Sequence, residues 1–313
     1  MSLSFHFRKI VRRGTLPNFI VLGTEKSGTT SVYYYLDQHP DVFMSPIKET
    51  NFFVFDGPIP DAIKWPKPQR FRVRTFDAYR QLFQRISTEK AIGEASPSYL
   101  YTPSVAERIH RRLPNAKMIV ILRDPADRAY SGYTMRLRNA TETRSFSQAI
   151  RDEDAGVYEP GWEYAKAHYV GLGFYARQLK PYLKLFGRSQ VAIYLFEDLK
   201  ADGPGFMREV FRFLEVDDTF ATDTSLRHNA SGVPRSRLFG PVLRETPLSR
   251  AVKKLLPPAL RKRAMVVQER LRGRLLRKET LPAEIRAGLV AGYRDDVLEL
   301  QEMIQRDLSH WLV

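Results

Sequence analysis

The sequence predicts an α/β fold: a parallel β-sheet flanked by helices, with one strand that passes through a P-loop-like turn into a helix. Two observations support this prediction. Short apolar segments alternate along the chain with amphipathic helical patterns, as in proteins whose helices cover a parallel sheet. The apolar segment at 19–22 is followed by two glycines and several hydroxyl residues, and then by a helical pattern. Open sheets of this kind bind ligands beyond the carboxyl ends of their strands, so we expect the functional site there.

The individual elements follow from the spacing of apolar residues. Strands are expected at 19–22, 91–93, 117–122 and 190–195, with a short extended segment at 42–44. Helices are expected at 29–38, 76–86, 103–113, 125–138, 146–153, 174–186 and 206–214. A basic helical pattern at 259–277 and a long helix at 282–308 follow. We expect a single domain over residues 1–313, with a basic helical C-terminal segment at about 240–313.

Composition excludes several classes of protein. The chain has 313 residues, of which 43% are hydrophobic and 27% are charged, so it can bury the core of one large α/β domain. It contains no cysteine, and its histidines lack metal-ligand spacing, so we expect neither a disulfide framework nor a metal site. The apolar segments are too short to cross a bilayer, and the N-terminus lacks the apolar core of a secretory signal. A cytoplasmic protein is therefore expected.

The positive charge is concentrated in one part of the chain. The formal net charge is +15, and the segment 227–278 has fifteen Lys and Arg against Glu245 and Glu269, which leaves it with thirteen of those charges. Basic amphipathic helices bind anionic membranes or acidic polymers, and a solvated helix face has the same pattern. We expect peripheral membrane contact through this segment, and we do not expect a nucleic acid as a partner.

The strongest motif is the octet GTEKSGTT at 23–30. Its glycines have the spacing of a Walker phosphate loop, but Thr29 occupies the position of the Walker lysine, and the cation is Lys26 inside the loop. Backbone amides of such a turn and the start of the following helix bind an anion. This arrangement suits a phosphosulfate better than a magnesium-bound triphosphate. The residues expected to hold the anion are Lys26, Ser27, Gly28, Thr29 and Thr30. The alternative is a tight turn that only joins a strand to a helix.

A second anion motif, RDPADRAYSGY, lies at 123–133, directly after the apolar strand 117–122. Asp124 and Pro125 are typical of an N-cap and a first helical residue. Arg123 then lies at the end of the strand and Ser131 on the second turn of the helix, so both can reach one oxyanion. Taken alone, such an arginine more often forms a surface ion pair.

A third motif, KETNFF, lies at 48–53. Glu49 has Lys48 on one side and two phenylalanines on the other, which are conditions that tune the pKa of a carboxylate. A carboxylate of this kind can take the proton of an attacking hydroxyl. The alternative is a solvated Lys–Glu pair beside buried phenylalanines.

With these motifs, the chain resembles the sulfotransferases that use 3′-phosphoadenosine 5′-phosphosulfate (PAPS), especially the branch with the heparan sulfate enzymes and bacterial relatives. The resemblance implies a sulfotransferase or P-loop NTPase-like fold. It also implies transfer of a sulfuryl group to a hydroxyl of a carbohydrate, a glycolipid or another small molecule, with 3′,5′-bisphosphoadenosine (PAP) as product and no metal. Arg123 and Ser131 would hold the 3′-phosphate, Lys26 would neutralise the departing phosphate, and Glu49 would be the catalytic base.

Two further segments parallel elements of this family. The segment GEASPSY at 93–99 resembles an element of the acceptor side, although Ala95 stands where the heparan 3-O branch has a lysine. The residues expected to bind the acceptor are Lys48, Glu94, Ser98 and Tyr99. The alternative is that those of the 93–99 segment make only local hydrogen bonds. The loop at 227–237 resembles a late cofactor clamp, so Arg235 and Arg237 are expected to contact phosphate.

Two other function classes remain open on the residues alone. A nucleotide kinase or NTPase with a degenerate loop is disfavoured by Thr29 and by Arg123, which stands where a Walker B acid would follow its strand. A basic membrane- or nucleic-acid-binding protein would retain the loop without its function. Metal-free binding of PAP favours sulfuryl transfer, whereas magnesium-dependent binding of ATP favours an NTPase.

Overall fold

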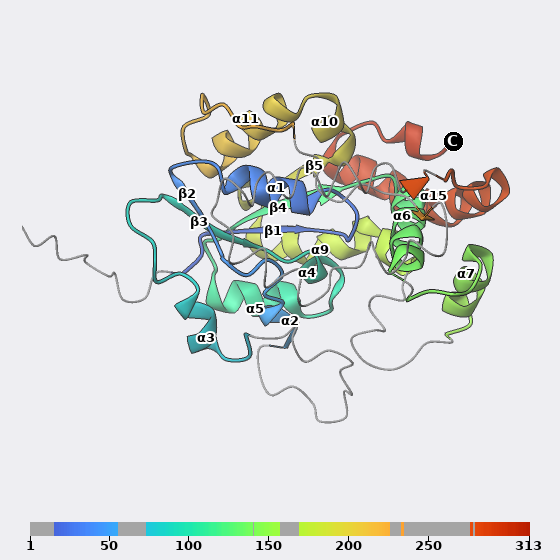
Figure 1. Cartoon of the computed structure of the whole chain (residues 1–313), viewed down its shortest axis with the longest axis horizontal. Coiled ribbons are helices and arrows are strands. Elements are labelled where there is room, and N and C mark those ends of the chain that lie inside the picture. Colours follow the sequence, from blue (N-terminus) through green and yellow to red (C-terminus); the bar gives the residue numbers. More distant parts are fainter. Residues whose placement is uncertain are drawn as a thin grey trace, which may run out of the picture. The chain divides into compact units, whose positions relative to one another are not determined.

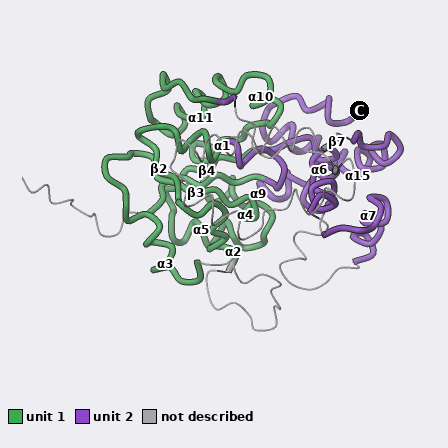
Figure 2. Tube along the Cα trace, in the orientation of Figure 1, with its two compact units in different colours: residues 1–23, 32–121, 180–223 green, residues 24–31, 122–179, 224–313 purple. Residues whose placement is uncertain are grey.

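The computed structural model describes residues 16–55, 73–139, 141–156, 169–225, 233–234, 276–277 and 279–313 (Figure 1). The chain divides into two compact units (Figure 2). Unit 1 comprises Met1–Gly23, Val32–Ile121 and Lys180–Asp223, and unit 2 comprises Thr24–Ser31, Leu122–Leu179 and Thr224–Val313. The single domain expected from the sequence stays a prediction.

Unit 1 contains a five-stranded sheet with the order β2-β3-β1-β4-β5. Its strands are β1 (Phe19–Gly23), β2 (Val42–Met44), β3 (Ala91–Ala95), β4 (Lys117–Leu122) and β5 (Val191–Leu195). The pairings of β1 with β3 and β4, and of β2 with β3, are parallel. Every residue of β1 and β3 is buried, which explains why these strands are continuous short runs instead of alternating patterns. The expected parallel sheet is confirmed.

Helices cover both faces of the sheet in unit 1 (Figure 1). They are α1 (Thr29–Leu36), α2 (Phe52–Phe55), α3 (Phe76–Gln81), α4 (Ser98–Tyr101), α5 (Val105–Arg112), α10 (Phe196–Ala201) and α11 (Gly203–Leu214). The first three residues of α1 belong to unit 2. Helices α1 and α11 pack on one face, where Leu36 and Phe211 are fully buried with Val21 of β1. Helices α4 and α5 lie on the other face in Figure 1.

Close packing within the sheet explains one glycine of the sequence. Gly93 of β3 lies opposite Phe19 of β1. A Cβ atom at position 93 would lie 2.3 Å from the Phe19 ring, which is far inside van der Waals contact. Any larger residue at this position would therefore push apart the two strands that precede the candidate site.

Unit 2 contains most of the remaining elements that the structure describes. They are α6 (Pro125–Arg138), α7 (Phe146–Asp154), β6 (Val233–Pro234), β7 (Leu276–Arg277) and α15 (Ala283–Ile304), with short 3₁₀ turns at Gly171–Gly173 and Ser309–Trp311. Helix α9 (Tyr175–Phe186) begins in unit 2 and ends in unit 1, and a further 3₁₀ turn at Arg188–Gln190 precedes β5. Within unit 2, α6 contacts both α15 and the 3₁₀ turn at Gly171–Gly173.

One expected helix needs correction. The basic pattern at 259–277 predicts helix up to Arg277, but Leu276 and Arg277 form β7, which pairs antiparallel with β6. Backbone hydrogen bonds to a segment distant in sequence override the local helical pattern at these two residues. The rest of that predicted helix lies outside the described residues.

Candidate functional site

The octet at 23–30 forms a turn that leads from β1 into α1. Within it, the Thr24 and Ser27 hydroxyls are 2.8 Å apart, and the Ser27 amide donates to the Thr24 carbonyl at 3.2 Å. Gly28 has a φ of 93°, a conformation that favours glycine. Lys26 also lies in the left-handed region, at φ 78°, which is costly for a residue with a Cβ atom. Such strained residues are common at functional sites, where the surrounding structure fixes them.

The electrostatic surroundings of Lys26 favour the approach of an anion. Burial is the main cause that lowers its pKa from 10.5 to about 8, and the cations Arg138 and Arg123 lower it further, against the opposing effect of Glu25. A lysine that is desolvated among arginines is a good partner for a multiply charged anion, because the anion relieves their mutual repulsion. All of these residues belong to unit 2.

Arg123, the first residue of the second predicted motif, contacts the turn at 23–30. Its Nη1 atom donates to the Lys26 carbonyl at 3.4 Å, and its Nη2 atom lies 3.5 Å from Asp127. The Tyr175 hydroxyl donates to the Arg123 carbonyl at 2.9 Å and so holds the backbone at the end of β4. The two anion motifs, which are almost one hundred residues apart in the sequence (|i−j| = 97), therefore meet within unit 2.

The start of α6 is fixed in the way that its sequence predicts. The Asp124 side chain accepts from the Asp127 amide at 2.8 Å, and Pro125 occupies the first turn. Ser131 lies further along the same helix and is 5% exposed.

Arg286 of α15 adds a contact that the motifs do not indicate. It donates to Asp124 at 2.7 Å and to Asp127 at 3.1 Å. No local signal identifies Arg286, because it is 162 residues away from Asp124 in sequence.

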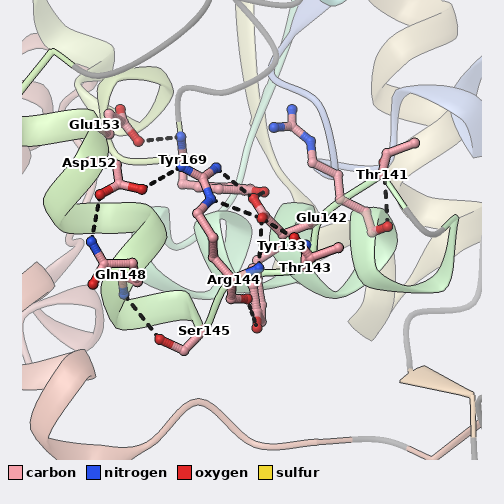
Figure 3. Close-up of polar contacts among 11 residues, drawn as sticks. Tyr133, Thr141, Glu142, Thr143, Arg144, Ser145, Gln148, Asp152, Glu153 and Tyr169 are labelled. Carbon is pink, nitrogen blue, oxygen red and sulfur yellow. Dashed lines mark hydrogen bonds and ion pairs between the residues drawn. The ribbon is translucent and has the colours of Figure 1, made fainter.

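A partly buried polar cluster supports the other end of α6 (Figure 3). Arg136 lies 3.7 Å from Glu25 of the phosphate loop, and its guanidinium stacks over the Tyr169 ring at 4.8 Å. The Tyr169 hydroxyl donates to Glu142 at 2.9 Å, and Arg144 joins Glu142 at 2.8 Å. Burial by itself would raise the pKa of Glu142, but hydrogen bonds from Arg144, Tyr169 and neighbouring amides lower it to about 2. Through Arg136 and Tyr169, the loop residue Glu25 is thus connected to Glu142, whose carboxylate stays ionised at neutral pH.

Arg144 also connects this cluster to α7. Its Nη1 atom lies 2.7 Å from Asp152 of that helix, and Gln148 donates to the same carboxylate at 2.6 Å (Figure 3). These contacts hold α7 to the segment that precedes it.

In unit 1, the KETNFF segment has the features expected from the sequence. Lys48 Nζ lies 2.8 Å from Glu49 Oε1, and the Glu49 side chain is 47% exposed. Phe52 and Phe53 are buried beside it and form an edge-to-face pair with centroids 5.1 Å apart. The candidate base therefore combines an accessible carboxylate, an adjacent cation and an apolar support.

The other residues expected on the acceptor side are buried. Glu94 and Tyr99 are 0% exposed and Ser98 is 5% exposed. Tyr99 donates to Glu94 at 3.0 Å, and Ser98 donates to Asn51 at 2.5 Å. The bond from Tyr99 to Glu94 is local, as in the alternative, whereas the bond from Ser98 to Asn51 joins residues 47 apart in the sequence. Thr50, which no motif singled out, donates to Glu94 at 2.6 Å.

Arg235 and Arg237 lie outside the described residues, so their expected phosphate contacts stay a prediction. Among the residues that the structure does describe, no group of three or more histidine, cysteine or acidic residues is placed to hold a metal ion. Within the same ranges, no helix is both long enough and apolar enough to cross a membrane.

Comparisons with known proteins agree with this geometry. The family model for the sulfotransferase domain matches residues 16–232. Heparan sulfate glucosamine 3-O-sulfotransferase 3B1 of Mus musculus is 32% identical over 200 residues, which cover 64% of this chain and 46% of that protein. Membrane-associated sulfotransferase kil1 of Dictyostelium discoideum is 37% identical over 149 residues, which cover 46% of this chain and 29% of that protein. The matches thus span less than half of the length of these two relatives.

Two solved structures are similar along almost the entire chain. A sulfotransferase from Alicyclobacillus acidocaldarius superposes with a TM-score of 0.71 at 32% identity and covers 95% of this chain and 99% of its own. The sulfotransferase domain of the Synechococcus olefin synthase superposes with a TM-score of 0.52 at 17% identity, over 97% of this chain and 99% of its own, and supports the fold alone. From the matched family model, the chain belongs to the sulfotransferase family.

Proposed function

We propose that this protein transfers the sulfuryl group of PAPS to a hydroxyl group of an acceptor and releases PAP. The observation that supports it best is the 3.4 Å contact between Arg123 and the Lys26 carbonyl, because it joins two anion-binding motifs in one unit. The donor has two separate anionic ends, a 3′-phosphate and a 5′-phosphosulfate. One motif is available for each.

The chemistry of the donor set fits such a molecule. The loop contains the hydroxyls of Ser27, Thr29 and Thr30, the Gly28 backbone and the Lys26 ammonium, and donors of these kinds suit the phosphosulfate. Arg123 and Ser131 suit the 3′-phosphate, since a guanidinium binds phosphate through a fork of donors. Arg235 and Arg237 are proposed as additional phosphate contacts. No residue in this scheme requires a metal ion.

The bound donor would supply an activated sulfonate, and the protein would supply position and charge. The bond between sulfur and the 5′-phosphate oxygen breaks while a bond from the acceptor oxygen to sulfur forms. Glu49 takes the proton of the acceptor hydroxyl, and Lys26 balances the charge that develops on the departing phosphate. Lys48 forms an ion pair with this carboxylate, with its Nζ atom 2.8 Å from Glu49 Oε1.

We propose a carbohydrate hydroxyl as the acceptor, on a free glycan, a glycolipid or a related small molecule. The names of two relatives support a glycan: heparan sulfate glucosamine 3-O-sulfotransferase 3B1, and human carbohydrate sulfotransferase 15, which is 28% identical over 66% of this chain and 45% of its own length. Ala95 replaces the lysine of the heparan 3-O branch, so we do not propose heparan sulfate itself. Contacts of Lys48, Ser98 and Tyr99 with the acceptor, peripheral membrane contact and a cytoplasmic location stay predictions.

Titration calorimetry with PAP in the absence of metal tests this function. Wild-type protein should bind PAP, and Arg123→Ala should weaken binding by about tenfold or more, since it removes a charged hydrogen-bond donor. Lys184→Ala, an exposed lysine of α9, is the control and should bind PAP normally. Binding of ATP that needs magnesium, without binding of PAP, would instead identify an NTPase.

Turnover is measured with radiolabelled PAPS and a panel of glycans and small hydroxyl compounds, and products are identified by mass spectrometry. Glu49→Gln should lower kcat by about 10²-fold or more and leave PAP affinity unchanged, because it removes the base alone. Lys26→Ala should lower kcat by about 10²-fold or more. Full activity of Glu49→Gln would exclude Glu49 as the base.

A further inference from the structure

The candidate base lies in a strained piece of backbone. Glu49 and Asn51 both lie in the left-handed region, with φ angles of 61° and 52°, and Thr50 lies between them. Asparagine tolerates this conformation, but a glutamate pays a steric penalty, so other contacts must hold it there. Such strain persists only where the surrounding structure over-determines the backbone.

Thr50 is the anchor of this segment. It is 1% exposed, and its hydroxyl donates to Glu94 Oε2 at 2.6 Å. The same hydroxyl lies 2.9 Å from the Tyr99 hydroxyl. The side chain of the residue between the two strained positions is therefore buried and bonded, while the Glu49 carboxylate remains 47% exposed.

Glu94 is the centre of the buried cluster. Its two carboxylate oxygens accept from four hydroxyl groups, those of Thr50 at 2.6 Å, Ser96 at 2.8 Å, Tyr79 at 2.9 Å and Tyr99 at 3.0 Å. The side chain has no exposed surface, and these four hydroxyl groups all belong to the protein itself. Four donors converging on one buried carboxylate fix its position and that of every group bonded to it.

Segment 94–98 also holds the neighbours of Thr50. The Glu49 amide donates to the Ala95 carbonyl at 2.9 Å, and the Asn51 amide donates to Ser96 Oγ at 3.2 Å. Three successive residues, 49 to 51, are thus bonded to the end of β3 and to Ser96, which follows it. Both segments belong to unit 1.

We propose that Glu94 is a positioning residue for the reaction: through the Thr50 hydroxyl it holds the left-handed backbone that directs the Glu49 carboxylate. This inference rests on the proposed function of Glu49. It replaces the acceptor contact expected from the sequence for Glu94, because all four hydroxyl contacts of Glu94 are internal to the protein.

The principal test uses Thr50→Val, which removes the hydroxyl and keeps the shape of the side chain. It should lower kcat by about tenfold to a hundredfold, because a small misplacement of a catalytic group is costly, and it should leave the Kd for PAP within about twofold of wild type. Thr50→Ser restores the hydroxyl and should retain at least about half of the wild-type kcat. A purely structural role would lower PAP affinity and kcat together and would not be rescued by serine.

The matched control is Thr222→Val. Thr222 is also a buried threonine of unit 1, but its hydroxyl has no hydrogen-bond partner among the described residues. Its kcat should equal that of the wild type. Glu94→Gln and the double variant Thr50→Val/Glu94→Gln complete a double-mutant cycle. The double variant should lose no more kcat than the more impaired single variant, since both substitutions remove the same hydrogen bond between Thr50 and Glu94.

A second measurement does not depend on turnover. Hydrogen–deuterium exchange of the Glu49 amide, which is bonded to the Ala95 carbonyl, should be at least about tenfold faster in Thr50→Val than in wild type or Thr222→Val. Unchanged exchange together with unchanged kcat would overturn the positioning role, as would a serine variant as impaired as the valine variant. Failure of wild-type protein to bind PAP would overturn the proposed function instead, and the exchange result would still decide whether Thr50 holds this backbone.

Discussion

Lys26 combines a strained backbone with a lowered pKa. Its φ is 78°, and burial inside the turn, together with the cations Arg138 and Arg123, lowers its pKa to about 8. If Lys26 binds the donor as proposed, the affinity for the donor should depend on pH near neutrality.

The affinity for PAP should fall as the pH rises through about 8. The bound anion favours the charged form of Lys26, so the pKa is higher in the complex than in the free protein, and the complex takes up a proton between these two values. Within that window the affinity should fall by up to about tenfold for each pH unit. Calorimetry from pH 6.5 to 9.5, in buffers with different ionisation enthalpies, measures both the slope and the proton uptake.

Lys26→Arg and Lys26→Ala are the controls for this pH dependence. Arginine stays charged throughout the range and alanine is never charged, so both variants should show a flat affinity above pH 7. A slope in Lys26→Ala equal to that of wild type would assign the titration to another group.

Single residues differ in how far the sequence reveals them. Lys26, Arg123 and Glu49 belong to short motifs whose chemistry is local, and the structure joins the first two. Thr50 and Arg286 act through partners 44 and 162 residues away, so neither has a local signal. The burial of Glu94 could not be predicted from the sequence either, since a carboxylate at the end of a strand is usually solvated.

At the scale of elements, α6 organises the second anion motif. Its N-terminus follows from Asp124 and Pro125, which cap the helix as the sequence predicts. Helix α15 then reaches this N-terminus through Arg286, which binds both Asp124 and Asp127. Since Arg123 also lies 3.5 Å from Asp127, Arg286 balances a carboxylate that would otherwise compete with the proposed phosphate for Arg123.

Arg286→Ala should therefore raise the Kd for PAP by about fivefold, which corresponds to about 1 kcal/mol of lost electrostatic balance beside the phosphate. It should also lower the melting temperature, because two carboxylates lose their partner. Arg294→Ala, at an exposed position of the same helix, is the matched control. Equal PAP affinity in the two variants would show that α15 has no part in the anion site.

The strands were easier to predict than the short helices. Buried parallel strands are continuous apolar segments, so β1 and β4 are evident from the sequence. Helices α2 and α4 have four residues each, too few for a period of 3.6 to be visible, and they were missed. The β6–β7 pair was missed because strand pairing between distant segments has no signal in either one.

For the whole molecule, charge is the feature that local motifs do not explain. Thirteen of the fifteen net positive charges come from residues 227–278, most of which lie outside the described residues. A charge imbalance of this size produces attraction to anionic surfaces that weakens with salt.

Vesicle sedimentation tests the predicted membrane contact. The protein should sediment with vesicles that contain about one third phosphatidylserine, and release is expected between about 50 and about 300 mM salt. Replacement of Arg261, Lys262 and Arg263 by glutamine should weaken this binding by about tenfold or more, at about 1 kcal/mol for each charge near the surface. Vesicles of phosphatidylcholine are the control. Equal binding to both kinds of vesicle would contradict an electrostatic contact.

The division of the chain has a consequence for biosynthesis. Unit 2 draws on 24–31, on 122–179 and on 224–313, and Arg286 binds carboxylates that are synthesised more than 150 residues earlier. A ribosome therefore delivers the start of α6 long before the helix that binds its carboxylates. Chains interrupted between these points would leave Asp124 and Asp127 without Arg286, so the nascent protein depends on late-made residues to complete a part that it makes earlier.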